Sequence, residues 1–204
     1  MSLISTVAEL EALYSEPVQP TARLKVLDHV SDQYHAFIHA SPFMVLASVG
    51  AAGVDCSPRG DPAGFVRVAD RKTLLIPDRR GNNRLDSLRN IIEDPRVHLL
   101  FLIPGIGETL RVVGRAVISV DPELCASFTM QGKAPRCVIV VTVEEVYTQC
   151  QKALVRSRLW DPSTQISRAE LPTMGQIFST ISKGEFDGEA YDKAYPERMR
   201  QTIY

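Results

Sequence analysis

The feature that most constrains the fold is a series of short apolar segments, separated by turn residues, between residues 43 and 150. Such segments are typical of strands, and short connections between them favour antiparallel neighbours. Strands are predicted at 43–49, 54–58, 64–68, 73–76, 96–103, 109–120 and 136–149. A helical pattern at 84–92 and a short helix after Asp121 interrupt the series. Helices do not alternate with strands, so the sequence predicts a mainly β fold (α+β class), an antiparallel barrel or sandwich with accessory helices.

Helical patterns flank the strand region on both sides. Ser5-Thr6 followed by Glu9 resembles a capping box at the start of a first helix. Thr21 can cap a second helix. Further helices are predicted at 32–40, 152–159 and 173–182. A length of 204 residues fits one domain. Its predicted parts are N-terminal helices (1–40), a barrel (41–150) and a helical C-terminal extension (151–204).

Charge and the length of apolar runs exclude several classes of protein. The chain carries 23 basic and 24 acidic residues, so its bulk charge disfavours nucleic-acid binding. No apolar run approaches the roughly 20 residues that a membrane helix needs. The N-terminus lacks a basic stretch followed by an apolar one, so no signal peptide is expected. The four cysteines are irregularly spaced, as reduced thiols are. Together these features predict a cytoplasmic protein.

Two patterns that resemble known sites are weak. His35 and His39 lie four residues apart and could bind a metal from one helix face, but the Glu of an H-E-x-x-H motif is absent. Two solvent-facing histidines are the favoured interpretation, so no metal site is predicted. Gly105 and Gly107 begin a glycine pattern, yet Leu110 stands where a dinucleotide-binding loop needs its third glycine.

The segment 77–88 carries the strongest sign of a binding site. It places three arginines, two asparagines and one glycine at the start of the predicted helix. A helix N-terminus presents free N–H groups and the positive end of the helix dipole. Arginine adds donors whose geometry matches phosphate. The pattern therefore favours an anion site, and a solvated basic loop without a function is the alternative.

Two predicted strands add polar side chains that packing does not require. Ser57, Arg59 and Asp61 fall on one face if the chain is extended there. Arg111 and Arg115 share a face of a later strand and need an anionic partner. That partner is either a ligand or a carboxylate of the chain itself. The candidate carboxylates are Glu108, Asp61 and Glu144.

Taken in order, these motifs resemble a known family. The runs Ser57–Asp61 (SPRGD), Gly81–Asn90 (GNNRLDSLRN) and Leu110–Arg115 (LRVVGR) follow one another as in the pyridoxamine 5'-phosphate oxidase-related FMN-binding split-barrel proteins. The resemblance covers about residues 40–160 and is strongest to a bacterial flavoprotein subgroup marked by the first two runs. It implies a six-stranded antiparallel split β-barrel. It also implies a homodimer that binds FMN at the subunit interface, with both chains lining each site.

The resemblance further implies which residues bind the cofactor. Ser57 and Arg59 would lie beside the flavin on the second strand. Pro77 and Asp78 would edge the isoalloxazine ring. The phosphate would be held at the helix start by Asn83, Arg84 and Arg79.

Two later segments complete the implied site. Arg111 would reach the flavin or its phosphate from the long strand. In the tail, Lys152, Arg156 and Trp160 are spaced four apart, which places them on one helix face. A tryptophan and two cations beside a flavin would form a wall of the site. The alternative is an amphipathic surface helix that Trp160 anchors to the barrel.

The sequence departs from the oxidase itself at its substrate-binding parts. The oxidase has an R-x-V-L-L-K strand and a C-terminal W-R-L-x-P signature, whereas this chain has Ser57–Asp61 and Arg200–Tyr204. Pyridoxamine 5'-phosphate oxidation is therefore not expected. The resemblance implies an FMN-binding flavoprotein, in the first instance an oxidoreductase acting on an unidentified small molecule. The alternative is a non-catalytic protein that binds or carries flavin, haem or a deazaflavin. Haem would need an axial ligand such as His98.

Overall fold

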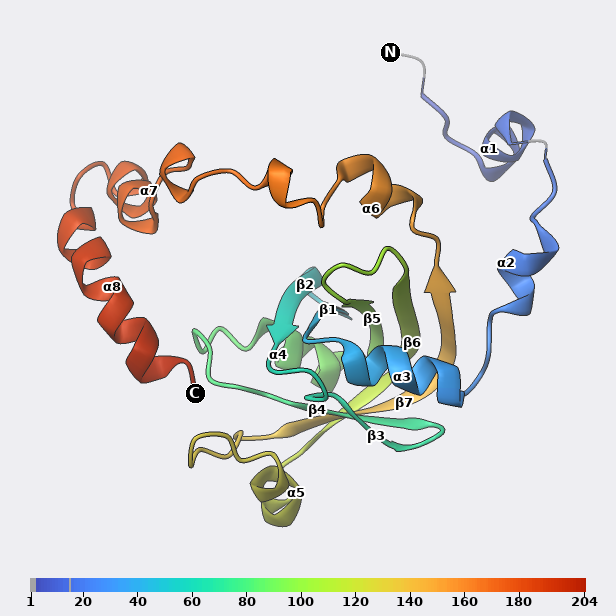
Figure 1. The fold of residues 1–204 in the computed structure, drawn as a ribbon, viewed down its shortest axis with the longest axis horizontal. Coiled ribbons are helices and arrows are strands. Elements are labelled where there is room, and N and C mark those ends of the chain that lie inside the picture. Colours follow the sequence, from blue (N-terminus) through green and yellow to red (C-terminus); the bar gives the residue numbers. More distant parts are fainter. Residues whose placement is uncertain (1–2, 15) are drawn as a thin grey trace.

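The computed structural model describes residues 3–14 and 16–204 and contains an antiparallel β-sheet flanked by helices (Figure 1). The described residues form seven strands in the order β2-β1-β5-β6-β7-β4-β3. Their bounds are β1 Phe43–Gly50, β2 Gly53–Gly60, β3 Arg67–Asp70, β4 Thr73–Pro77, β5 Arg96–Leu102, β6 Thr109–Ser119 and β7 Val138–Gln149. The predicted class, mainly antiparallel β with accessory helices, is confirmed. The sheet has seven strands where the resemblance implied six, because the short strand β3 pairs with β4 at one edge.

Eight α-helices lie within the described residues. Their bounds are α1 Val7–Leu13, α2 Pro20–Leu24, α3 Asp32–Ala40, α4 Asp86–Glu93, α5 Pro122–Ser127, α6 Lys152–Ser157, α7 Met174–Ile181 and α8 Gly188–Thr202. Local capping signals placed several of them correctly. Thr6 and Glu9 form the expected capping box, and Asp121 caps α5 as expected. Thr173, the first residue of the helix predicted at 173–182, is the N-cap of α7. None of these helices is long and apolar enough to cross a membrane.

Two helix predictions were wrong at their ends. Helix α2 begins at Pro20 with Gln19 as its N-cap, so Thr21 lies inside the helix. Proline is favoured at the first helical position because its φ is already helical and its missing N–H has no partner to lose there. Helix α6 ends at Ser157, earlier than predicted, because Arg158 adopts a left-handed conformation with φ 52°.

One face of the sheet carries the hydrophobic core. In β6, Leu110 and Val112 are fully buried, whereas Arg111 between them points to the opposite face and is half-buried. Helices α3 and α4 cover the core face with Ile38 and Ile91. Each large apolar side chain buried in this way contributes roughly 1.5–3 kcal/mol. The buried core therefore holds the strands rigidly, and the side chains at the rim of the barrel project from fixed positions.

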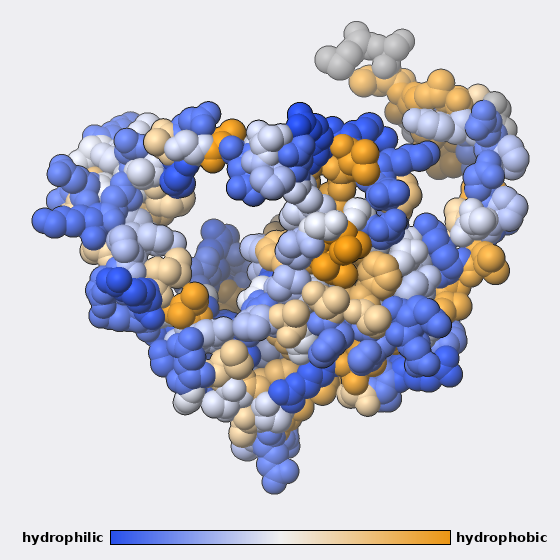
Figure 2. Space-filling model, viewed as in Figure 1, coloured by the Kyte–Doolittle hydropathy of each residue, from blue (hydrophilic) through white to orange (hydrophobic). Residues whose placement is uncertain are grey.

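The terminal segments stand apart from this core. Figure 1 shows α1 and α2 on one side of the barrel and α6 to α8 arching around another. Helices α1, α2 and α6 contain no buried residue. Apolar side chains are instead exposed on them, among them Val7, Leu13 and Val155 at 71%, 66% and 60%. Figure 2 shows apolar surface on the N-terminal helices.

Candidate binding site

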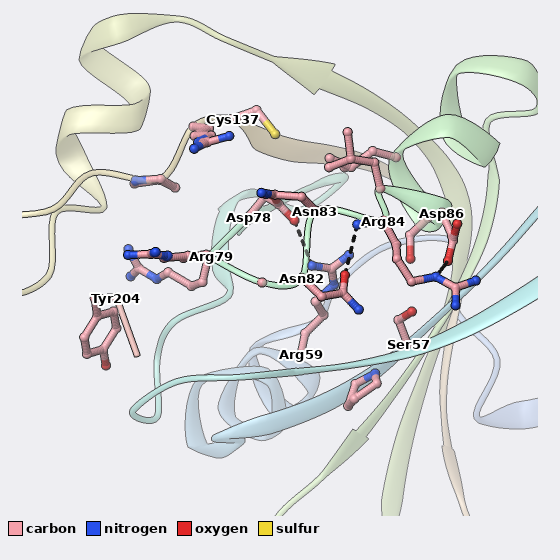
Figure 3. Close-up of a pocket in the computed structure, with 18 of the residues that line it drawn as sticks. Ser57, Arg59, Asp78, Arg79, Asn82, Asn83, Arg84, Asp86, Cys137 and Tyr204 are labelled. Atoms are coloured by element: carbon pink, nitrogen blue, oxygen red, sulfur yellow. Dashed lines mark hydrogen bonds and ion pairs between the residues drawn. The ribbon is translucent and has the colours of Figure 1, made fainter. Parts of the chain in front are cut away.

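A cavity of about 1040 Å³ opens at the rim of the barrel beside the start of α4 (Figure 3). Its walls come from β2, the loop 78–85 that leads into α4, the loop 133–137 before β7, and Tyr204. The pairing of β4 with β7, which sets Pro77 opposite Val138, brings the two loops together. Ligand cavities in proteins typically measure about 300–1,000 Å³. This cavity therefore has room for a ligand the size of a nucleotide.

Two ion pairs join the ends of β2 and β4 beside the cavity. Arg59 Nη1 lies 2.7 Å from Asp78 Oδ1, and Arg79 Nε lies 2.6 Å from Asp61 Oδ2. The side chain of Asp61 is 2% exposed. Strand β2 is at one edge of the sheet and β4 lies next to the other edge. The two pairs therefore connect opposite ends of the sheet and hold the loop 78–85 against β2.

Arg59 has a buried donor that no group of the described chain satisfies. Its Nη1 donates to Asp78, but its Nε atom is buried and has no hydrogen-bond partner. The Arg59 side chain is also part of the cavity wall. Buried polar atoms are hydrogen-bonded in the great majority of cases. The unpaired Nε leaves the Arg59 guanidinium with an unsatisfied donor beside the cavity, so the residues present fit an oxygen-rich or anionic group.

The start of α4 lacks a side-chain cap. Its N-cap residue, Leu85, is left-handed with φ 62° and makes no capping hydrogen bond. Asn83, two residues earlier, also has a positive φ of 61°. Non-glycine residues in this region are uncommon, and such strained positions cluster at functional sites. The first-turn N–H groups and the positive end of the helix dipole are left to attract an anion.

Arginines surround this helix start. The Arg84 side chain is 74% exposed and pairs with Asp86 at 2.8 Å between Nε and Oδ2. Exposed ion pairs of this kind typically contribute at most about 1 kcal/mol, so the guanidinium is free to turn towards a ligand. The main-chain N–H of Arg84 donates to Asn82 Oδ1 at 3.0 Å. Arg80 and Arg136 add positive charge to the same walls.

Asp55 places a carboxylate in one part of the cavity. Its Oδ2 accepts hydrogen bonds from Ser87 Oγ at 2.6 Å and from Ser57 Oγ at 2.8 Å. The hydrogen bond from Ser87 is the largest effect that holds the pKa of Asp55 below its ordinary value. The carboxylate is therefore ionised at neutral pH and adds a negative charge beside Ser87 in the first turn of α4.

Six of the residues predicted to bind the cofactor lie together in the cavity wall. They are Ser57, Arg59, Asp78, Arg79, Asn83 and Arg84. Pro77 directly precedes them as the last residue of β4 and is buried in the sheet. Ser57 and Arg59 share the cavity-facing side of β2, as the alternation predicted. Asp61 lies just beyond the end of that strand.

The other four predicted residues lie outside this cavity. Arg111, in β6, has its guanidinium 5.6 Å from the centre of a tyrosine ring on β7. Lys152 and Arg156 are exposed on α6. Trp160 lies beyond the end of α6, so the prediction that it shares their helix face was wrong. Its Nε1 donates to the main-chain oxygen of Ile106 at 2.8 Å.

Sequence reasoning missed one side of the cavity, formed by Lys133, Arg136, Cys137 and Tyr204. Lys133 Nζ donates to the main-chain oxygen of Tyr204 at 2.8 Å, and Tyr204 Oη donates to Asp61 Oδ1 at 2.6 Å. A basic loop rich in glycine and proline directly before a strand was a usable signal for Lys133 and Arg136. Tyr204 has no such signal, because its position depends on the path of the whole C-terminal segment.

Comparison with protein families gives a match to the barrel. The family model described as pyridoxamine 5'-phosphate oxidase matches residues 30–150. That range runs from just before α3 to the end of β7 and contains most of the cavity wall, but not Tyr204. No curated protein matches the chain.

Several solved structures are similar to the chain. HupZ from Group A Streptococcus aligns with a TM-score of 0.49 and 17% identity, covering 59% of this chain and 94% of HupZ. General Stress Protein 26 from Bacillus anthracis aligns with a TM-score of 0.42 and 18% identity, over 55% and 88% of the two chains. An FMN-binding protein from Syntrophomonas wolfei aligns with a TM-score of 0.44 and 12% identity, over 56% and 82%.

Proposed function

We propose that this chain, which belongs to the pyridoxamine 5'-phosphate oxidase family, is a flavoprotein that holds FMN in the cavity at the start of α4. The observation that carries the proposal is Arg59, a residue of the cavity wall whose buried Nε has no partner among the described residues. The uncapped start of α4 is a second group of donors without a partner side chain. Phosphate and flavin oxygens are acceptors that both would bind.

The charges of the cavity suggest how FMN would be oriented. Asn83 and Arg84, at the start of α4, would hold the phosphate. Arg79, which was predicted to join them, instead pairs with Asp61 beside Tyr204. Ser57 and the ion pair between Arg59 and Asp78 would then flank the ring system.

An oxidoreductase acting on a small molecule is the proposed activity. FMN, when bound, supplies hydride or electron transfer. The contribution of this chain would be to bind the cofactor, to orient it and to exclude water from it. The Arg59 guanidinium, fixed by Asp78 at 2.7 Å, would place a positive charge beside the ring, and such charges tune the electron affinity of a flavin.

The walls of the cavity favour flavin over haem. None of the described residues that line it is a histidine. His98, named above as a candidate axial ligand, lies in β5 with an exposed side chain and is not part of the wall. A haem in this cavity would therefore lack a histidine ligand from this chain.

The proposal includes a homodimer. Arg111, Lys152, Arg156 and Trp160 lie outside the cavity of their own chain, and in a dimer they would reach the cavity of the partner. The exposed apolar side chains of α1 and α6 need a covering surface. The charges of these helices are complementary: α1 carries Glu9 and Glu11, whereas α6 carries Lys152 and Arg156.

Titration with FMN and riboflavin tests the cofactor assignment. The purified protein should bind FMN more tightly than riboflavin, which lacks the phosphate. Arg84→Ala should weaken FMN binding roughly tenfold or more, since hydrogen bonds to charged groups contribute about 1.5–3 kcal/mol, and should leave riboflavin binding unchanged. Arg96→Ala is the matched control, because Arg96 is also exposed and paired with a neighbouring aspartate, Asp94, but lies outside the cavity wall.

Two results would contradict the assignment. One is a wild-type protein that takes up neither flavin. The other is an Arg84→Ala variant that binds FMN as tightly as the wild type does. Reoxidation of the reduced, flavin-loaded protein by a panel of small molecules then separates an oxidoreductase from a flavin carrier.

A further inference from the structure

The C-terminal segment returns to the cavity at Tyr204. Its phenol oxygen donates to Asp61 Oδ1 at 2.6 Å, and its main-chain oxygen accepts from Lys133 Nζ at 2.8 Å. The Arg79 guanidinium lies 5.6 Å from the centre of the Tyr204 ring. Asp61 and Arg79 are the buried ion pair that fixes the loop 78–85. Tyr204 is therefore attached to the groups that shape the cavity.

The helices that lead to Tyr204 are packed independently of the barrel. Helices α7 and α8 meet at Gly175 and Gly188, where an added Cβ on Gly175 would lie 2.0 Å from the Gly188 oxygen. Asp192 on α8 accepts hydrogen bonds from Thr173 Oγ1 at 2.5 Å and from the Gly175 N–H at 2.9 Å. Phe178 on α7 packs edge-on against an aromatic ring of α8. These contacts fix α7 and α8 relative to each other, and Tyr204 lies just beyond the end of α8.

Tyr204 is the one aromatic side chain among the described residues that line the cavity. The rest of the wall is mainly charged, polar or small. Figure 3 shows Tyr204 on the side of the cavity away from Arg84 and Asp86. An aromatic ring gains about 0.5–1.5 kcal/mol when it packs against another ring. A flavin whose phosphate lies at Arg84 would extend its rings away from that helix start.

We propose that Tyr204 is a ligand-contact residue that binds the ring system of the flavin, at the end of the cavity opposite the phosphate. This inference rests on the proposed function and extends it to a residue outside the range that matches the family. The hydrogen bond to Asp61 holds the phenol in place, and the ring provides the contact. The hydrogen bond to the Asp61 carboxylate raises the pKa of Tyr204. The phenol is therefore protonated at neutral pH and can donate.

The test compares two flavins on protein freed of any co-purified cofactor. Tyr204→Ala should weaken binding of FMN and of riboflavin by the same factor, about fivefold, so the ratio of the two affinities stays at the wild-type value. Tyr204→Phe keeps the ring and should retain most of the affinity for both. Ile203→Ala, at a neighbouring half-exposed position (54%), is the control and should bind like the wild type. Bound flavin should also be more fluorescent in Tyr204→Ala, since a stacked phenol quenches it.

The outcomes separate this inference from the proposed function. A wild type that binds FMN better than riboflavin, with a Tyr204→Ala variant that binds both equally well as the wild type, would overturn the inference alone. A loss in Tyr204→Phe as large as that in Tyr204→Ala would also overturn it, because the hydroxyl and not the ring would then carry the effect. A wild type that binds neither flavin would overturn the proposed function, and the inference with it.

Discussion

Burial determines the chemistry of Cys137 at the cavity wall. Removal of the thiol from water raises its pKa to about 11, and the negative charge of Asp78 acts in the same direction. The Arg59 guanidinium opposes this shift only in part. Thiolates are the reactive form of cysteine. Cys137 is therefore an inert side chain that contributes shape to the cavity and does not act as a nucleophile.

Alkylation of the folded protein tests this conclusion. At pH 8 a thiol with a pKa of about 11 is roughly one part in a thousand thiolate. Iodoacetamide should therefore modify the exposed Cys56 and Cys150 while Cys137 stays unmodified, as read by mass spectrometry of peptides. Unfolding in guanidinium should make Cys137 as reactive as the other two. Modification of Cys137 in the folded protein at the rate of Cys56 would contradict the argument.

The pairing of β6 with β7 depends on one close approach. The register shifts by a β-bulge between Val113 and Gly114. At Gly114 an added Cβ would lie 2.3 Å from the carbonyl oxygen of Thr142 and 3.0 Å from Val141 Cγ1. A main-chain oxygen inside a sheet cannot move aside as a flexible side chain can. The two longest strands of the barrel can therefore pair in this register only with glycine at this position.

Gly114→Ala should accordingly destabilise the protein by about 3 kcal/mol, the upper end for a group forced into a packed core. The matched control is Gly81→Ala, where the added Cβ has no neighbour within 4 Å, so the free energy of unfolding should change by less than about 0.5 kcal/mol. Denaturant titration measures both. Equal midpoints for the two variants would show that the strands can separate locally at the bulge.

Elements set by local signals were predictable from the sequence, and those set by distant contacts were not. Thr6 and Asp121 each cap a helix through their own neighbours, and both were identified. Thr173 also caps a helix, but it was predicted only as the first residue of one. The arginine-rich turn before α4 was found in the same way as the first two caps. Lys133 joins that turn only because β7 pairs with β4. Tyr204 reaches that turn because α7 and α8 fold back towards the barrel, and no periodicity of the sequence predicts how two helices are placed relative to the barrel.

At the scale of the whole molecule, the apolar surface is larger than the barrel alone can cover. A seven-residue helix such as α1 is only marginally stable alone in water, yet its apolar residues are exposed. On the outer face of the sheet, Leu100 lies between Val45 and Arg111 and is only half-buried. Figure 2 shows openings between the C-terminal segment that carries α6 to α8 and the barrel. In the homodimer proposed above, a second copy of the chain would cover these surfaces.

Light scattering after size-exclusion chromatography should therefore give a mass of twice 22.6 kDa for the wild type. Leu100→Glu places a charge on the outer face of β5 and should shift the mass towards that of one chain. Val120→Glu, at a position 72% exposed beyond the end of β6, should leave the mass unchanged. Circular dichroism checks that both variants are folded. A wild type with the mass of one chain would rule out the dimer.

The ion pairs Arg59–Asp78 and Arg79–Asp61 join two parts of the sheet across the cavity. An open sheet has two edges. Here the edge strand β2 and the strand β4, next to the other edge, are joined by these ion pairs along a seam that the cavity lines. A ligand bound in the seam contacts both sides of it at once, so it acts as a reversible cross-link between the first strands of the barrel and the last. Binding of the proposed cofactor would then add to the two ion pairs and stabilise the folded barrel.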